Sequence, residues 1–136
     1  MKLTEKQYKL FLEARLKTKD NLLGGVEKKY HNKKIEYNGI KFDSIKEMRH
    51  YVALKELEKL GYIKDLQLQV KFELQPKFKY NNKNIRAIIY IADFVYFDTS
   101  ANKTIVVDVK GFKTKEYLIK KKMFMYKYQN YIFKEI

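Results

Sequence analysis

The chain has 136 residues, of which 46% are hydrophobic, so it is long enough to bury a core and is not a disordered tail. Thirty lysines and arginines against 16 acidic residues give a net charge of +14, which favours a polyanionic partner, nucleic acid first and an anionic membrane second. The absence of cysteine excludes disulfides, a thiol nucleophile and a cysteine-ligated zinc site. The chain does not start with a signal-peptide pattern, and no apolar run approaches the roughly 20 residues that span a bilayer. We therefore expect a soluble intracellular protein without a membrane partner.

We interpret residues 1–136 as a single domain, with residues 1–34 as an N-terminal helix plus a basic arm. Thr4–Lys17 is predicted to be helical because a capping residue precedes apolar side chains that recur at every fourth position. The arm that follows ends in Lys33 and Lys34, with aromatic side chains interleaved among its cations. It would contact DNA by charge and stacking, or be exchanged between two subunits of a dimer; the sequence leaves both open.

Two strong local signals follow the arm. Asn38-Gly39 separates residues 35–37 from residues 40–42 and supplies the positive φ angles of a type I′ turn, which predicts a short hairpin. Ser44–Leu60 is predicted to form a helix that stops at Gly61.

Three strands are expected after this helix. Apolar and polar side chains alternate over residues 66–74, which indicates a half-buried strand limited by Pro76. Residues 85–97 and 105–110 are apolar runs that predict two further strands, joined by the polar turn 98–104.

A second long helix, rich in lysine, is predicted over Thr114–Tyr128, and residues 131–133 would add a last strand. The order of elements is helix, hairpin, helix, three strands, helix and strand. This order favours a mixed β-sheet flanked by helices on both sides, in the α/β or α+β class.

Charged side chains interrupt the two apolar strands. Asp93 is a lone acid in the first, and Asp108 and Lys110 end the second, where strand alternation places them on one face. Charge at such a position is costly unless it is paired, bound to a metal or functional. Carboxylates are the hard oxygen ligands that Mg²⁺ or Mn²⁺ prefers, and the ammonium would orient a water or neutralise charge on a phosphate. Metal-dependent phosphodiester cleavage requires this combination.

Each of these residues also has a structural interpretation. Asp93 would accept backbone N–H groups or pair with Lys110. The face that carries Asp108 and Lys110 would be the charged outer face of an edge strand.

Glu47 has two compatible roles. Its spacing from Ser44 matches a capping box, in which the carboxylate folds back onto the helix start. It also continues an apolar stripe through Tyr51 and Leu54, from which a carboxylate would reach the strand ends as a further metal ligand. Gln69, on the polar side of the neighbouring strand, is a weaker candidate for the same site.

The helix that begins soon after Lys110 would bind phosphate. Its first backbone N–H groups, together with the Thr114 hydroxyl, would hold one phosphate group. The alternative is that its lysine run is simply a solvated face. On the first interpretation four cations follow the DNA backbone: Lys113, Lys115, Lys120 and Lys121.

Glu47 on a helix, Ala92-Asp93 at a strand end and Asp108-Val109-Lys110 together resemble the motif of the PD-(D/E)xK nuclease superfamily, whose fold is restriction-endonuclease-like. Four longer blocks of sequence are similar to a small family of uncharacterised, mostly phage-encoded endonuclease-like proteins. Ala92 replaces the proline of the superfamily name and Asp108 stands where glutamate is common, and the superfamily tolerates both departures. The resemblance covers about residues 28–128 and is carried by Lys29–Lys34, Gly39–Glu47, Tyr90–Phe94 and Val107–Thr114.

The resemblance implies a Mg²⁺- or Mn²⁺-dependent DNA endonuclease in which Asp93, Asp108 and Glu47 bind the metal and Lys110 completes the catalytic set. It also implies a cytoplasmic location in a bacterial host, if the protein is phage-encoded. Small size and strong basicity favour recognition of branched DNA, in particular the Holliday junction, over base readout. Symmetric cleavage of two strands predicts a homodimer. The alternative function is a non-catalytic basic DNA-binding protein that retains the fold, and a weaker third is an RNA-binding accessory factor.

Overall fold

The structure is a computed structural model that describes residues 34–110 and 112–136. The predicted helix Thr4–Lys17 and the basic arm up to Lys33 lie outside the described residues. The described chain divides into two compact units. The first unit contains residues 34–66 and 98–101, and the second contains residues 67–97 and 102–136. The single domain remains a prediction.

The first unit begins with the predicted hairpin. Strands β1 (Ile35–Tyr37) and β2 (Ile40–Phe42) pair in antiparallel fashion. The connecting Asn38 and Gly39 have φ angles of 49° and 78°. Both central residues of the turn are therefore left-handed, as the type I′ turn requires, and the prediction is confirmed.

The helix α2 (Ile45–Lys59) also confirms its prediction. Ser44 caps its start, because its Oγ accepts a hydrogen bond from the Glu47 N–H at 3.1 Å. The helix ends at Lys59 with Leu60 as its C-cap, and Gly61 then turns the chain with a left-handed φ of 82°. The buried side chains of α2 include the predicted stripe and are Glu47, Met48, His50, Tyr51, Ala53, Leu54 and Leu57.

The second unit is built on a four-stranded sheet with the order β3-β6-β7-β8. Strand β7 (Lys103–Asp108) pairs in parallel with β8 (Ile132–Glu135). The helix α3 (Lys115–Lys127) provides the crossover that a parallel pair needs. The short turn between β6 (Ile88–Asp98) and β7 permits only an antiparallel pair, so the sheet is mixed. The predicted mixed α+β fold is confirmed, and so is the last strand.

Aromatic side chains fill the core between α3 and the sheet. The Phe72 ring of β3 (Ile63–Gln75) meets the Phe124 ring of α3 edge to face, with centroids 5.0 Å apart. The remaining buried members of this core are Leu74, Tyr90, Ala92, Val95, Val106 and Tyr117.

The predicted strand 85–97 is wrong at its start. The structure has a hairpin there, formed by β4 (Phe78–Tyr80) and β5 (Lys83–Ile85), and β6 begins only at Ile88. The hairpin turns at Asn81-Asn82, with φ angles of 47° and 60°. Asparagine adopts left-handed φ angles more readily than other side chains do, which makes this pair an effective turn.

Two further boundaries differ from the predictions. Asp93 lies within β6 rather than at a strand end. The predicted strand 105–110 begins earlier and stops at Asp108, so Val109 and Lys110 follow the strand instead of belonging to it. Strand alternation therefore does not explain where the Lys110 side chain points.

Candidate functional site

Asp108 is the most buried charged residue among the described residues, with 1% exposure at the end of β7. Its Oδ2 accepts a hydrogen bond of 2.5 Å from the Tyr90 hydroxyl of β6. Burial, followed by the bond to Asp108, raises the pKa of Tyr90 above its usual range, so the phenol keeps the proton that it donates. Because β7 lies between β6 and β8, the edge-strand interpretation of Asp108 is wrong.

The second oxygen of Asp108 faces the Lys110 ammonium. The Lys110 Nζ lies 3.2 Å from Oδ1 and forms an ion pair with it, although Oδ1 accepts no hydrogen bond. The same ammonium lies 4.7 Å from the centre of the Tyr117 ring, a cation–π contact. The Lys110 side chain is 32% exposed, so this amine reaches both the buried carboxylate and the solvent.

The backbone explains how Lys110 stays in place outside β7. Its N–H donates to the Ile136 carbonyl at 3.0 Å, and the Ile136 N–H donates to the Asp108 carbonyl at 3.0 Å. These two bonds continue the pairing with β8 beyond the end of β7. The predicted proximity of Asp108 and Lys110 is thus confirmed, by a different local structure from the one expected.

Asp93 lies against the backbone that follows Asp108. Its Oδ2 accepts a hydrogen bond of 2.8 Å from the Val109 N–H, which confirms the predicted backbone contact. Its Oδ1 accepts one of 3.3 Å from the side-chain amide of Gln69 on β3. Burial, and then the neighbouring charge of Asp108, raises the pKa of Asp93 above its usual range, and the Val109 bond opposes this. We call Gln69, Asp93, Asp108 and Lys110 the paired-acid site.

Gln69 has an unusual backbone for a strand residue. Its φ angle is 52°, a left-handed conformation that costs energy for a side chain other than glycine. The position lies within β3, and its amide reaches Asp93 across the sheet. The structure therefore places Gln69, the weaker candidate from the sequence, beside the predicted metal ligand Asp93.

Glu47 belongs to the first unit. It is buried in the first turn of α2, where its N–H bonds to the Ser44 hydroxyl. The two aspartates belong to the second unit. A metal-binding role for Glu47 stays a prediction.

A second cluster of charge surrounds Glu135 of β8. Lys113 lies 2.6 Å from Oε1 and Lys121 lies 3.2 Å from Oε2, while the Tyr117 hydroxyl also donates to this carboxylate. Lys113 first, then Tyr117 and Lys121, lower the pKa of Glu135 to about 2. Two of the predicted DNA-binding lysines are therefore paired with an acid.

The other predicted phosphate-binding residues lie at the start of α3 and on its surface. Lys120 pairs with Glu116 at 3.1 Å, whereas Lys115 is exposed. Thr114 caps α3, because its Oγ1 accepts a hydrogen bond of 3.1 Å from the Tyr117 N–H. Lys34 is exposed in the first unit, and Lys33 lies outside the described residues.

Sequence reasoning missed three residues of these clusters: Tyr90, Tyr117 and Glu135. Each contacts a predicted site residue from another strand or helix. The sequence offered one usable signal, because Tyr90 carries a hydroxyl inside an apolar run, where a buried hydroxyl needs a partner.

The donor set fits a magnesium ion. Asp93 and Asp108 present carboxylate oxygens close enough for the charge of Asp108 to contribute to the raised pKa of Asp93. The buried Oδ1 of Asp108 accepts no hydrogen bond. In residues 34–110 and 112–136 no three acidic or histidine side chains gather to hold a metal ion by themselves. Magnesium commonly uses one or two carboxylates and completes its shell with waters and substrate phosphates.

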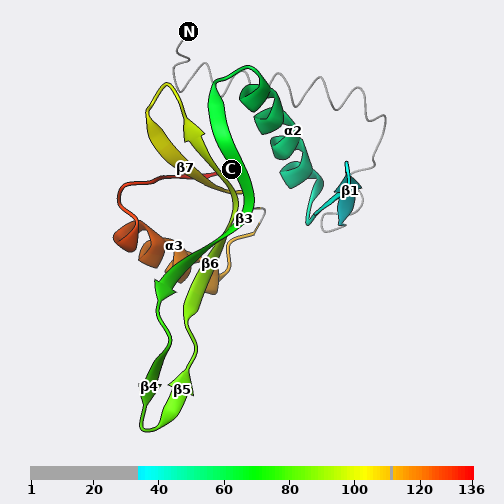
Figure 1. Cartoon of the computed structure of the whole chain (residues 1–136). Coiled ribbons are helices and arrows are strands. Elements are labelled where there is room, and N and C mark those ends of the chain that lie inside the picture. The colour runs from blue at the N-terminus through cyan, green and yellow to red at the C-terminus, as the bar shows by residue number, and fades with distance from the viewer. Residues whose placement is uncertain (1–33, 111) are drawn as a thin grey trace. The chain divides into compact units, whose positions relative to one another are not determined.

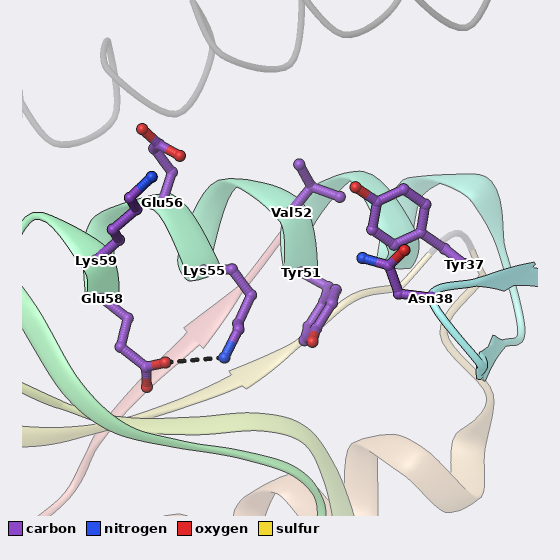
Figure 2. A pocket seen from close by; sticks show the side chains of 8 residues that line it. All are labelled: Tyr37, Asn38, Tyr51, Val52, Lys55, Glu56, Glu58 and Lys59. Carbon is purple, nitrogen blue, oxygen red and sulfur yellow. Dashed lines mark hydrogen bonds and ion pairs between the residues drawn. The ribbon is translucent and has the colours of Figure 1, made fainter.

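A cleft of about 510 Å³ lies in the first unit, between the β1–β2 hairpin and one side of α2 (Figure 2). An ion pair of 3.0 Å joins Lys55 and Glu58 within it. Its lining carries both signs of charge and includes none of the predicted site residues: Tyr37, Asn38, Tyr51, Val52, Lys55, Glu56, Glu58 and Lys59.

Fold and site together define a mixed α+β protein with a buried aspartate–lysine pair beside a second aspartate. The chain belongs to the DUF1064 family, described as a protein of unknown function, which matches residues 27–135. No curated protein matches the chain. A crystal structure of protein VC1899 from Vibrio cholerae is similar at 16% identity and a TM-score of 0.33, covering 91% of this chain and 32% of that one. The chain thus spans about a third of the length of VC1899.

No helix among the described residues is long and apolar enough to cross a bilayer.

Proposed function

We propose that this protein is a Mg²⁺-dependent DNA endonuclease selective for branched DNA, with the Holliday junction as its preferred substrate. The observation that carries the proposal is the arrangement around Asp108. This residue is 1% exposed and forms an ion pair with Lys110. The next residue, Val109, donates its N–H to Asp93. A buried carboxylate is costly, and a partly exposed ammonium beside two acids is the set that phosphodiester cleavage uses. The resemblance to PD-(D/E)xK nucleases, which have a restriction-endonuclease-like fold, assigns the same residues.

Each residue of the paired-acid site has a role in this proposal. Asp93 and Asp108 would hold the Mg²⁺ or Mn²⁺ ion through their carboxylate oxygens. When bound, the metal lowers the pKa of a water and stabilises the leaving oxygen. Lys110 orients the attacking water or neutralises charge on the phosphate, because its amine is partly open to solvent. Gln69 holds Asp93 through its amide.

The substrate class follows from charge and size. A net charge of +14 on 136 residues supports binding to the phosphate backbone, which carries no sequence information by itself. Shape is then the feature left to select a substrate, and a four-way junction offers two strands for symmetric cleavage. We propose that a homodimer cuts both.

The test compares labelled four-way junction, flap and linear duplex DNA in Mg²⁺. Wild type is expected to cut the junction fastest, and Asp108→Asn to lower cleavage by about 100-fold or more with junction binding unchanged or tighter. Asp65→Asn is the matched control, because Asp65 is exposed and its φ of 57° suits asparagine. Tight binding without cleavage of any substrate would contradict the proposed nuclease activity. Cleavage of linear duplex as fast as of the junction would contradict the proposed selectivity for branched DNA.

The second candidate is a non-catalytic DNA-binding protein with the same fold. One observation favours it, since both oxygens of Asp108 already face partners, Tyr90 and Lys110, as in a structural ion pair. In that case Asp108→Asn lowers the free energy of unfolding, and the wild-type protein does not cleave DNA in the presence of Mg²⁺.

A further inference from the structure

The β4–β5 hairpin is an exposed element of the second unit. It joins β3 to β6 and extends beyond the ends of those strands (Figure 1). All six of its strand residues are exposed. An isolated two-stranded hairpin is only marginally stable, so side chains that it holds out to solvent contribute little to the core.

The charge of this hairpin has one sign. Its cations are Lys77, Lys79, Lys83 and Arg86, and the nearest acids along the chain are Glu73 and Asp93, outside it. The hairpin contains none of the acid–lysine pairs that occur around α3, such as Lys113 with Glu135. Its positive field is therefore not neutralised locally, and it attracts a polyanion.

The hairpin also exposes apolar rings among these cations. Phe78 is 44% exposed and Tyr80 is 67% exposed. Phe78 pairs directly with Ile85 and Tyr80 with Lys83, so these four side chains share one face. A shallow hollow of about 410 Å³ is lined by both kinds of side chain: Lys77, Phe78, Lys79, Asn84, Ile85 and Arg86.

We propose that the β4–β5 hairpin binds single-stranded DNA, with Phe78 and Tyr80 stacking on unpaired bases while the flanking cations contact phosphates. Aromatic rings interleaved with lysine and arginine are the combination that holds single strands, because every base offers a face for stacking. A second copy of this chain is a poorer occupant, since two such hairpins would repel each other. The choice of DNA rests on the proposed function, in which the hairpin would recognise the open bases at a branch point.

The test measures binding without cleavage. Fluorescence anisotropy in EDTA follows a labelled oligothymidine and a duplex of equal length. Tyr80→Ala is expected to weaken binding of the single strand by about five-fold or more and of the duplex by less. Tyr126→Ala, which removes another exposed tyrosine, is the matched control and is expected to leave both affinities unchanged. Tyr80→Phe retains the ring and should restore binding, which separates stacking from a folding defect.

Charge provides a second readout. For the single strand, a Lys79→Ala/Arg86→Ala variant is expected to reduce the slope of log affinity against log salt by about 0.7 for each phosphate that it no longer neutralises. An unchanged slope, or equal weakening by Tyr80→Ala and Tyr126→Ala, would overturn the proposal. So would a Tyr80→Ala variant that binds normally but loses self-association in sedimentation, because the hairpin would then be a contact between copies.

The outcome is independent of cleavage. If wild type cuts no DNA in Mg²⁺ but binding depends on Tyr80, the hairpin proposal stands and the nuclease proposal fails. If Asp108→Asn abolishes cleavage while Tyr80→Ala leaves single-strand binding intact, the reverse holds.

Discussion

At the scale of single residues, Asp108 is held by two groups of different character. The Tyr90 hydroxyl satisfies one oxygen with a neutral hydrogen bond inside the core, whereas Lys110 supplies the opposite charge at the solvent boundary. Removing either partner would leave the desolvation of the buried carboxylate partly uncompensated, which lowers the stability of the fold.

We expect Tyr90→Phe to lower the free energy of unfolding by about 1–3 kcal/mol, because it removes the donor to Asp108 and keeps the ring in the core. Urea denaturation followed by circular dichroism measures the change. Tyr80→Phe, at an exposed tyrosine, should change the free energy of unfolding by close to zero. If the two variants have the same midpoint as wild type, the hydroxyl does not support Asp108.

Glu135 gives a pH-dependent contribution to stability. Its pKa is lowered to about 2 in the folded protein from 4.5, chiefly by Lys113. The ionised form is thus favoured by folding, so the contribution is complete above pH 4.5 and is lost as the pH falls towards 2. Glu135→Gln should lower the free energy of unfolding by about 1 kcal/mol at pH 7. The difference from wild type should shrink between about pH 5 and pH 2 in denaturation curves, and a constant difference would contradict this account.

At the scale of elements, helix starts and tight turns were readable from the sequence. Ser44 and Thr114 cap α2 and α3 through their own hydroxyls, and Asn38-Gly39 forms the expected turn. These features depend on residues within three positions of one another, so they are determined locally. The Asn81-Asn82 turn was missed because the apolar residues after it were assigned to one continuous strand.

The cap of α2 provides a prediction at this scale. Ser44→Ala should cost about 1 kcal/mol of stability, because the N–H of Glu47 loses its acceptor. Ser44→Asn offers an equivalent acceptor and should cost much less. Thermal unfolding of the two variants distinguishes loss of the cap from a general effect of substitution, and equal melting temperatures for both would argue against it.

The paired-acid site was predictable only in part. Asp108 and Lys110 are two residues apart, and their ion pair needs little beyond local geometry. The contacts from Gln69 to Asp93 and from Tyr90 to Asp108 depend on which strands are neighbours and in which register. A single sequence does not contain that order, so Tyr90 and Glu135 could not be assigned in advance.

At the scale of the whole molecule, the excess of positive charge should dominate the proposed binding to DNA. The logarithm of the affinity for duplex DNA is expected to fall linearly with the logarithm of the salt concentration, with a slope of about −0.9 for each phosphate contacted. Lysines already paired with acids, such as Lys113, should contribute less than exposed ones such as Lys115. Anisotropy titrations of Lys113→Ala and Lys115→Ala test this order, and a greater weakening by Lys113→Ala would contradict it.

The central claim is that Asp93 and Asp108 form one divalent-cation site beside Lys110. A crystal of the protein soaked in Mn²⁺ and measured for anomalous scattering tests it directly. We predict one anomalous peak within bonding distance of both carboxylates, with Lys110 retained nearby. A peak that contacts neither aspartate, or both carboxylates still engaged as now with Tyr90, Lys110 and Val109 at saturating Mn²⁺, would contradict the claim.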